Sequence, residues 1–139
     1  MQDDQQGRER EPINKVQQLQ FELLRDVRYN LFDGAKVVDD LLAWRDLWYA
    51  VIADRCASST GKLYEQVIDL IRLRDIPRGY WNVDYVFIWT SDANLERLRQ
   101  MIEDRWQANV VDALDHDEAE MSMGCTLGPD DRILYVWWD

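Results

Sequence analysis

The only histidine of this 139-residue chain lies in a short acidic stretch of the C-terminal half, where Asp115, His116 and Asp117 are followed by Glu118 and Glu120. Carboxylates beside an imidazole could bind a divalent metal ion, or could raise the pKa of the histidine so that it serves as a general base. Neighbouring side chains in a loop diverge, however, and no second histidine could complete a metal motif. We therefore interpret the stretch as a solvated turn and predict no catalytic residue and no cofactor. Asp115, His116 and Asp117 are kept as candidate ligands only for a less favoured metal-dependent enzyme.

The two cysteines offer little reactive chemistry. Cys56 and Cys125 are far apart without a CxxC spacing, so neither a zinc site nor a disulfide framework is predicted. A reactive thiol needs wet, electropositive surroundings, whereas Cys125 alternates with Met121 and Met123 on an apolar face. The chain also has no motif of a serine hydrolase, a zinc protease or a dinucleotide-binding enzyme. These observations favour a protein that is not an enzyme.

One local stretch departs from the acidity of the chain. Arg72, Arg74 and Arg78 lie close to Tyr80 and Trp81, a combination that could clamp a phosphate or stack on a base. Such a run is more often a solvated loop whose arginines pair with nearby aspartates. We keep the three arginines as a candidate anion site.

The overall charge restricts the kind of partner. Asp and Glu outnumber Lys and Arg by 27 to 16, giving a formal net charge of −11, which argues against nucleic acid or an anionic membrane. A basic protein surface is the favoured partner, although acidity can also reflect coding bias or a salty cytoplasm. The longest apolar run, Leu47 to Ala53, is too short to cross a bilayer, and the first residues do not resemble a signal peptide. We expect a cytoplasmic protein.

The apolar spacing predicts three helices in residues 12–76, after a flexible tail at 1–11. The first runs from Pro12 to about Phe32, and the second, from Val37 to Ala53, is apolar around most of its circumference. We therefore expect this second helix to be the centre of the fold. The third begins after Thr60 and stops before Pro77.

Residues 80–139 predict a β-α-β-β arrangement. Strands are expected at 80–89, 120–127 and 133–138, with a turn at 128–131 and a helix from Ser91 or Asp92 to about Ala113. A right-handed crossover with the final strand in the centre would make a split βαβ unit. We predict a single α+β domain, a mainly antiparallel sheet with the fourth helix on one face and the N-terminal helices on the other.

Two surfaces could bind other proteins. The strand at 80–89 would leave an open hydrophobic edge, which predicts dimerisation through that edge. The seven Trp and six Tyr exceed what a small core needs, and aromatic residues often anchor interfaces, so we nominate Trp81, Tyr85, Trp137 and Trp138 as interface residues.

The sequence leaves three functions open. The first is a non-enzymatic acidic interaction domain, such as an inhibitor, an immunity-type protein or an adaptor, that binds a basic protein surface. The second is an oligomeric assembly subunit. The third is a metal-dependent enzyme that uses the acidic stretch around His116.

Overall fold

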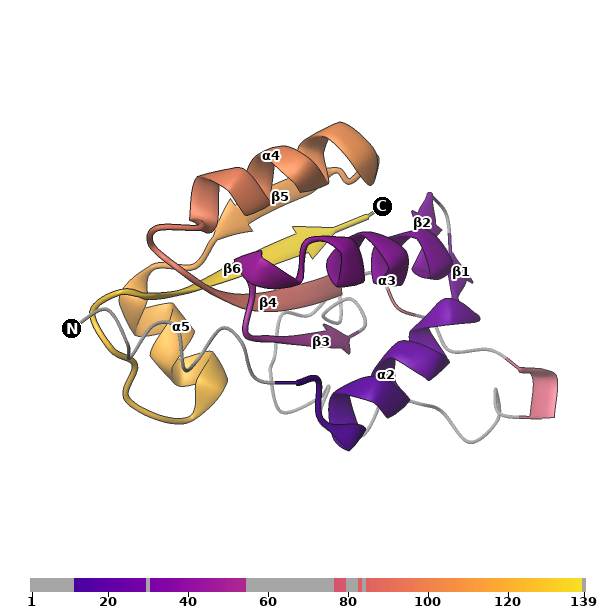
Figure 1. Ribbon diagram of the computed structural model, residues 1–139, viewed down its shortest axis with the longest axis horizontal. Coiled ribbons are helices and arrows are strands. Elements are labelled where there is room, and N and C mark those ends of the chain that lie inside the picture. Colours follow the sequence, from indigo (N-terminus) through magenta and orange to yellow (C-terminus); the bar gives the residue numbers. More distant parts are fainter. Residues whose placement is uncertain (1–11, 30, 55–76, 80–82, 84, 139) are drawn as a thin grey trace, which may run out of the picture.

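The computed structural model describes residues 12–29, 31–54, 77–79, 83 and 85–138 (Figure 1). The elements in chain order are α2 (Lys15–Arg25), β1 (Arg28–Tyr29), β2 (Phe32–Asp33), α3 (Gly34–Ala43), the 3-10 turn η1 (Arg45–Leu47), β3 (Ala50–Asp54), β4 (Tyr85–Ser91), α4 (Leu95–Arg105), β5 (Val110–Ala113), α5 (His116–Met123) and β6 (Asp131–Trp137). The α+β class predicted from the sequence is confirmed. None of the helices in the described ranges has the length and apolarity needed to span a membrane. The predicted tail at 1–11 and the third helix fall outside these ranges.

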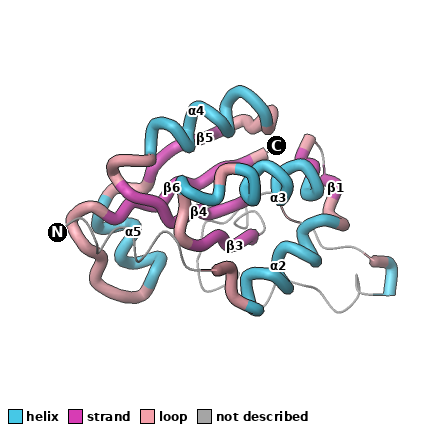
Figure 2. Tube along the Cα trace, in the orientation of Figure 1, coloured by secondary structure: helices cyan, strands magenta, loops and turns pink. Residues whose placement is uncertain are grey.

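A four-stranded antiparallel sheet forms the middle of the molecule, in the order β3-β4-β6-β5 (Figure 2). The last strand, β6, lies between β4 and β5, so that Trp137 stands opposite Tyr85 on one side and Val110 on the other. The predicted central position of the final strand agrees with this order. The strand on the outer side of β6, however, is β5 at residues 110–113 and not the predicted strand at 120–127.

The helices are distributed unequally over the two faces of the sheet. Side chains of α2, α3 and α4 join alternate residues of β3, β4 and β6 in one large buried core, and α3 lies in front of the sheet in Figure 1. A smaller core on the other face joins Ala119 of α5 to Leu127 and Ile133. The prediction that the N-terminal helices and the fourth helix cover opposite faces is therefore wrong.

The predicted central helix from Val37 to Ala53 is the largest correction. The helix α3 ends at Ala43, and Trp44 leaves the helical conformation before η1 and the strand β3 begin. A short apolar run cannot be assigned to a buried helix or to a buried strand by periodicity alone. Pairing with β4, in which Val51 stands opposite Ile88, makes the second half of this segment a strand.

The first predicted helix is also too long. The helix α2 ends at Arg25, and the chain turns through the two-residue strands β1 and β2 before α3 begins at Gly34. A Cβ atom at Gly34 would lie 1.8 Å from the carbonyl oxygen of Leu24, so only glycine permits this close approach of the two helices. Glycine at position 34 is thus required by packing.

The predicted helix reaching Ala113 and the predicted strand at 120–127 both change their class. The helix α4 stops at Arg105, Gln107 takes a left-handed conformation with φ 53°, and β5 follows. Residues 116–123 form α5, which ends at Gly124 with φ 73°. The alternation of polar and apolar residues at 120–127, which predicted a strand, therefore falls on the end of α5 and the residues that follow it.

The edge of β4 is not open, contrary to the dimer prediction for the strand at 80–89. In the described part of that strand, β3 pairs with one side of β4 and β6 with the other. The outer edge thereby moves to β3, where the side-chain amide of Gln17 donates to the carbonyl of Val51 at 2.8 Å and accepts from its N–H at 2.9 Å. A helix side chain thus takes the place of a neighbouring strand, which protects the edge.

A buried carboxylate joins α3 to α4. Asp40 is 4% exposed and accepts a hydrogen bond of 2.9 Å from the indole N–H of Trp106. Its other oxygen forms a 2.9 Å ion pair with Arg105, and this hydrogen bond and charge raise the pKa of the arginine. The Trp106 carbonyl in turn accepts from the indole N–H of Trp138, which continues the network into the core.

Replacing Gln17 by Met should destabilise the protein by about 1–3 kcal/mol, because the N–H and C=O of Val51 lose their partners in a part-buried position. Methionine preserves helix propensity, so the loss reports the hydrogen bonds. Denaturant unfolding measures it, and Gln20→Met on the same helix is the control. Equal stability of the two variants would contradict the role of Gln17.

Replacing Asp40 by Ala should cost about 1–3 kcal/mol, since the buried Trp106 N–H is left without an acceptor. Asp40→Asn keeps an acceptor and should cost less. The neighbouring Asp39 forms an exposed ion pair with Arg25, so Asp39→Ala should cost no more than about 1 kcal/mol. Unfolding free energies that rank Asp39→Ala as the more harmful change would refute the Asp40 network.

Candidate functional site

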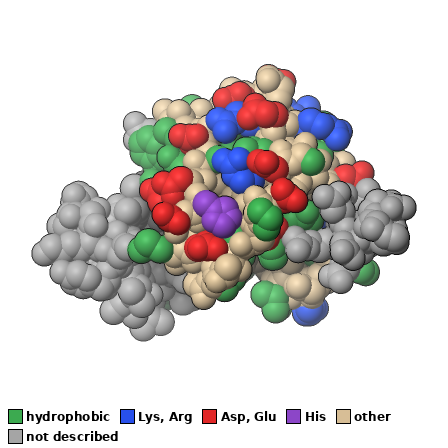
Figure 3. Space-filling view, turned by 90° about the vertical axis from the view of Figure 1, so that its left-hand side faces the viewer, with side chains coloured by type: hydrophobic (Ala, Val, Ile, Leu, Met, Phe, Trp, Pro, Cys, Tyr) green, Lys and Arg blue, Asp and Glu red, His purple; other side chains and the backbone are tan. Residues whose placement is uncertain are grey.

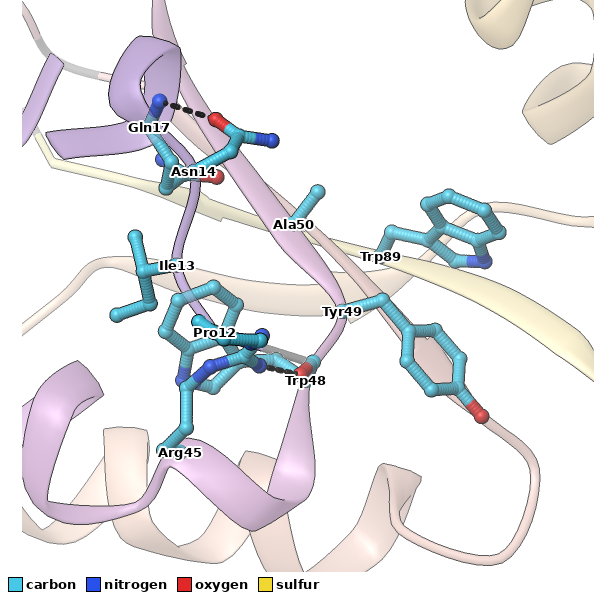
Figure 4. Close-up of a pocket in the computed structure, with 9 residues that line it drawn as sticks. All are labelled: Pro12, Ile13, Asn14, Gln17, Arg45, Trp48, Tyr49, Ala50 and Trp89. Carbon is cyan, nitrogen blue, oxygen red and sulfur yellow. Dashed lines mark hydrogen bonds between the residues drawn. The ribbon is translucent and has the colours of Figure 1, made fainter. Parts of the chain in front are cut away.

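A pocket of about 330 Å³ lies between the start of α2, the segment from η1 into β3, and β4 (Figure 4). Its apolar walls are Pro12, Ile13, Trp48, Tyr49, Ala50 and Trp89. The rings of Tyr49 and Trp89 meet edge to face with their centroids 5.3 Å apart. In Figure 4 the Tyr49 and Trp89 rings lie on one side of the β3 segment, and Pro12, Ile13 and the buried Trp48 lie on the other.

The polar side chains of the pocket are already used by the protein itself. Gln17 bonds to Val51, and Asn14 caps α2 by accepting from the N–H of Gln17 at 2.9 Å. Arg45 donates to the carbonyl of Trp48 and lies 4.2 Å above the centroid of the Trp48 ring. This lining holds neither a pair of carboxylates nor a nucleophile beside a base.

One buried carboxylate, that of Asp131, bonds to the lining of the pocket on the side of Trp89. The indole N–H of Trp89 donates to Asp131 at 3.2 Å, and the backbone of Asp130 bonds to the N–H of Asp92 at 2.8 Å. On the side of η1, the carbonyl of Asp46 accepts from the side chain of Asn94 at 3.3 Å. Arg45 is the charged side chain of the pocket lining, which contains no Asp or Glu.

An acidic surface lies over the end of the molecule that carries α5. Figure 3 shows the histidine among acidic side chains on this end. Residues 92–132 contain eleven acidic residues and four arginines. The whole chain contains 27 acidic and 16 basic residues, so the excess of negative charge is concentrated in this segment. We call the exposed carboxylates at this end the acidic end: Asp92, Asp112, Asp115, Asp117, Glu118 and Asp130.

Most arginines of this region are paired within the protein. Arg132 lies 2.9 Å from Asp92, and Arg99 lies 3.4 Å from Glu96 and 3.8 Å from Asp112. Arg105 is held by Asp40 on the α3 side. The carboxylates of α5 consequently keep most of their negative field.

The stretch around His116 has a structural role that the sequence interpretation missed. Asp115 is the N-cap of α5 and accepts from the N–H of Glu118 at 2.8 Å, while Glu118 accepts from the N–H of Asp115 at 3.2 Å. This reciprocal capping box is visible in the sequence as an aspartate followed three residues later by a glutamate. The predicted solvated turn is instead the start of a helix.

The neighbouring groups are also engaged in local contacts. His116 Nε2 lies 3.1 Å from the carbonyl oxygen of Gly128, and its Nδ1 lies 3.9 Å from Glu120. Glu120 accepts from the N–H of Leu127 at 2.8 Å. Within the described ranges, no three His, Cys, Asp or Glu side chains converge as metal ligands would. Cys125 is an exposed free thiol. The prediction that it lies on the apolar face of a strand is therefore wrong.

The nominated interface residues separate into two environments. Tyr85 and Trp137 are half-buried neighbours on the sheet face that carries α5, with ring centroids 6.4 Å apart. The shielded indole N–H of Trp137 has no hydrogen-bond partner in the described part of the protein. Trp138 is fully buried against Phe32 and Trp106, so it belongs to the core and not to a surface.

The remaining nominated residues lie mostly outside the described ranges. These are Trp81, Arg72 and Arg74, while Arg78 is described and exposed. The candidate anion site therefore stays a prediction.

Comparison with protein-family models, with curated proteins and with solved structures gave no match to this chain. Its function must therefore be inferred from its own side chains. The sequence did not predict the pocket, because the apolar spacing assigns Trp48 and Tyr49 to a helix and Trp89 to a strand with an unpaired edge. Only the pairing of β3 with β4 brings them together.

Replacing Asp115 by Ala should destabilise the protein by about 0.5–2 kcal/mol, because α5 loses its N-cap. Asp115→Asn retains a capping oxygen and should stay close to the parent protein. Thermal unfolding measures both, with and without added Zn²⁺ or Mg²⁺. A large metal-dependent rise in melting temperature that His116→Ala abolishes would contradict the capping role and revive a metal site.

Proposed function

We propose that this chain is a non-enzymatic acidic interaction domain that binds a basic surface of another protein, as an inhibitor, immunity-type protein or adaptor does. The observation that carries the proposal is the group of exposed carboxylates around the start of α5, Asp115, Asp117 and Glu118, together with Asp130 in the turn before β6. Asp92 and Asp112, at the same end, are paired with Arg132 and Arg99. A field of one sign over one surface attracts partners of the opposite charge.

The environment of the acidic end supports binding more than chemistry. Asp115 and Glu118 are committed to capping α5, and His116 and Glu120 contact the segment that follows it. Rigid carboxylates at a helix start can present charge without rearrangement, which lowers the entropic cost of association. Nucleic acid and anionic membranes are disfavoured as partners by the same charge.

The assembly-subunit alternative loses the surface on which it was based. The strand at 80–89 was expected to offer an open edge, but β3 occupies the edge of its described part and Gln17 in turn covers Val51 of β3. Exposed apolar side chains on α2, Val16, Leu19 and Leu23, remain as a surface that could serve such an assembly.

The test begins with capture of the partner from the source cells, followed by kinetic measurements on the purified pair. Raising the salt concentration from 0.05 to 0.5 M should slow association by about tenfold or more, since charge attraction is screened. Dissociation should change less.

A matched pair of variants locates the charge effect. Asp117→Asn with Asp130→Asn removes two charges from the acidic end and should weaken binding by roughly 2- to 30-fold. Glu22→Gln with Asp26→Asn removes two exposed charges from the α2 region and should leave binding nearly unchanged. Salt-independent association, or equal loss in both double variants, would overturn the proposal.

A further inference from the structure

We propose that the exposed side of α2 is a self-association surface, on which a second copy of this chain packs its own α2 in the antiparallel direction. The acidic end and the aromatic pocket take no part in this contact. The inference goes beyond the proposed function, because it concerns a different surface and a different partner.

The exposed side of α2 carries a stripe of apolar side chains. Val16, Leu19 and Leu23 are 71%, 48% and 49% exposed, whereas Phe21 and Leu24 of the same helix are buried. Spacings of three and four residues place the exposed three on one face of the helix, separate from the buried face. Single exposed apolar residues are common on protein surfaces, but a group of them marks a contact site. The same spacing is typical of a helix that packs along a second helix.

The charge of this part of the chain permits a second copy to approach. Residues 12–29 contain three basic and two acidic residues, although the whole chain has a formal net charge of −11. In Figure 1, α2 lies apart from α5 and the acidic end. Contact through the acidic end would oppose carboxylates to carboxylates, which like-charge repulsion disfavours. Contact through α2 avoids this repulsion and leaves the acidic end of each copy accessible.

Charged residues beside the stripe determine the direction of the second helix. Lys15 and Glu22 are exposed and seven residues apart, so they lie on the same flank of the stripe about two turns from each other. In an antiparallel pair related by a two-fold axis near Leu19, the same flanks of the two helices face each other. Lys15 of each copy then lies beside Glu22 of the other copy, and Val16 of each copy meets Leu23 of the other. Parallel packing would bring like charges to the same level and form neither pair.

Both charges of this flank are available for such pairs. Arg25 pairs with Asp39 of α3 at 2.8 Å, whereas Lys15 and Glu22 form no ion pair within the described ranges. Two Lys15–Glu22 pairs could therefore form without breaking an ion pair inside either copy. Exposed ion pairs contribute little binding free energy, so they select the direction of packing. Burial of the apolar stripe supplies most of the attraction.

Sedimentation equilibrium of the full chain tests the inference. A contact along one short helix is smaller than a standard interface, so a monomer–dimer equilibrium should appear between roughly 10 µM and 1 mM. Leu19→Gln removes an apolar side chain at the centre of the contact and should raise the dissociation constant about tenfold or more. Leu42→Gln makes the same change at a 41% exposed position on α3 and should alter the dissociation constant little. Glutamine has nearly the helix propensity of leucine, so both variants should fold.

Charge reversal tests the antiparallel direction. Lys15→Glu and Glu22→Lys each place like charges side by side and should raise the dissociation constant by roughly 3- to 10-fold. The double variant restores both pairs with the signs exchanged, so its dissociation constant should return to within about twofold of the parent value. Neither substitution touches the acidic end, and the affinity of each copy for a basic partner should stay unchanged.

Four outcomes would overturn the inference. A monomer at every concentration, with Leu19→Gln lowering the melting temperature more than Leu42→Gln, would identify another segment of the same chain as the occupant of the stripe. A monomer without that difference would leave the stripe to a different protein. A dimer that Leu19→Gln does not weaken would place the contact on another surface. A dimer that the double charge variant does not restore would contradict the antiparallel packing.

Discussion

The double hydrogen bond between Gln17 and Val51 determines how the N-terminal part meets the sheet. It satisfies the outward N–H and C=O of Val51 in β3, and it joins α2 to that strand. The start of α2 then becomes one side of the aromatic pocket and β3 the other. Edge protection and pocket formation are therefore consequences of the same contact, since a water-exposed edge could not hold α2 in one position.

The buried carboxylate of Asp40 has the corresponding role on the other side of the core. It joins α3 to α4 through Trp106 and Arg105, and both helices remain on the face of the sheet that also carries α2. Among the helices that the structure describes, α5 lies on the opposite face, at the end where exposed carboxylates gather.

The sequence predicted the class of the fold better than its details. The strand at β4, the central place of β6 and the amphipathic helix α4 follow from strong periodicity, although α4 ends earlier than expected. Residues 47–53 could not be assigned in this way, because a short apolar run fits a helix or a strand until its partner strand is known. That single ambiguity concealed both the closed edge of β4 and the pocket.

The candidate site was only partly predictable for a related reason. Acidic charge is a property of composition, so a basic partner could be proposed from the sequence. The capping box of Asp115 and Glu118 was also present in the sequence, but their spacing was interpreted as a loop. The pocket depends on contacts between residues 34 or more positions apart, such as Gln17 with Val51, and no local pattern encodes them.

Hydrogen–deuterium exchange on the purified complex with its natural partner would test the central claim most directly, because it locates the contact surface without any substitution. The account predicts added protection in two segments: the turn after β4, and the stretch from the start of α5 to the turn before β6. Protection confined to the aromatic sheet face of Tyr85 and Trp137, or to the exposed side of α2, would contradict it.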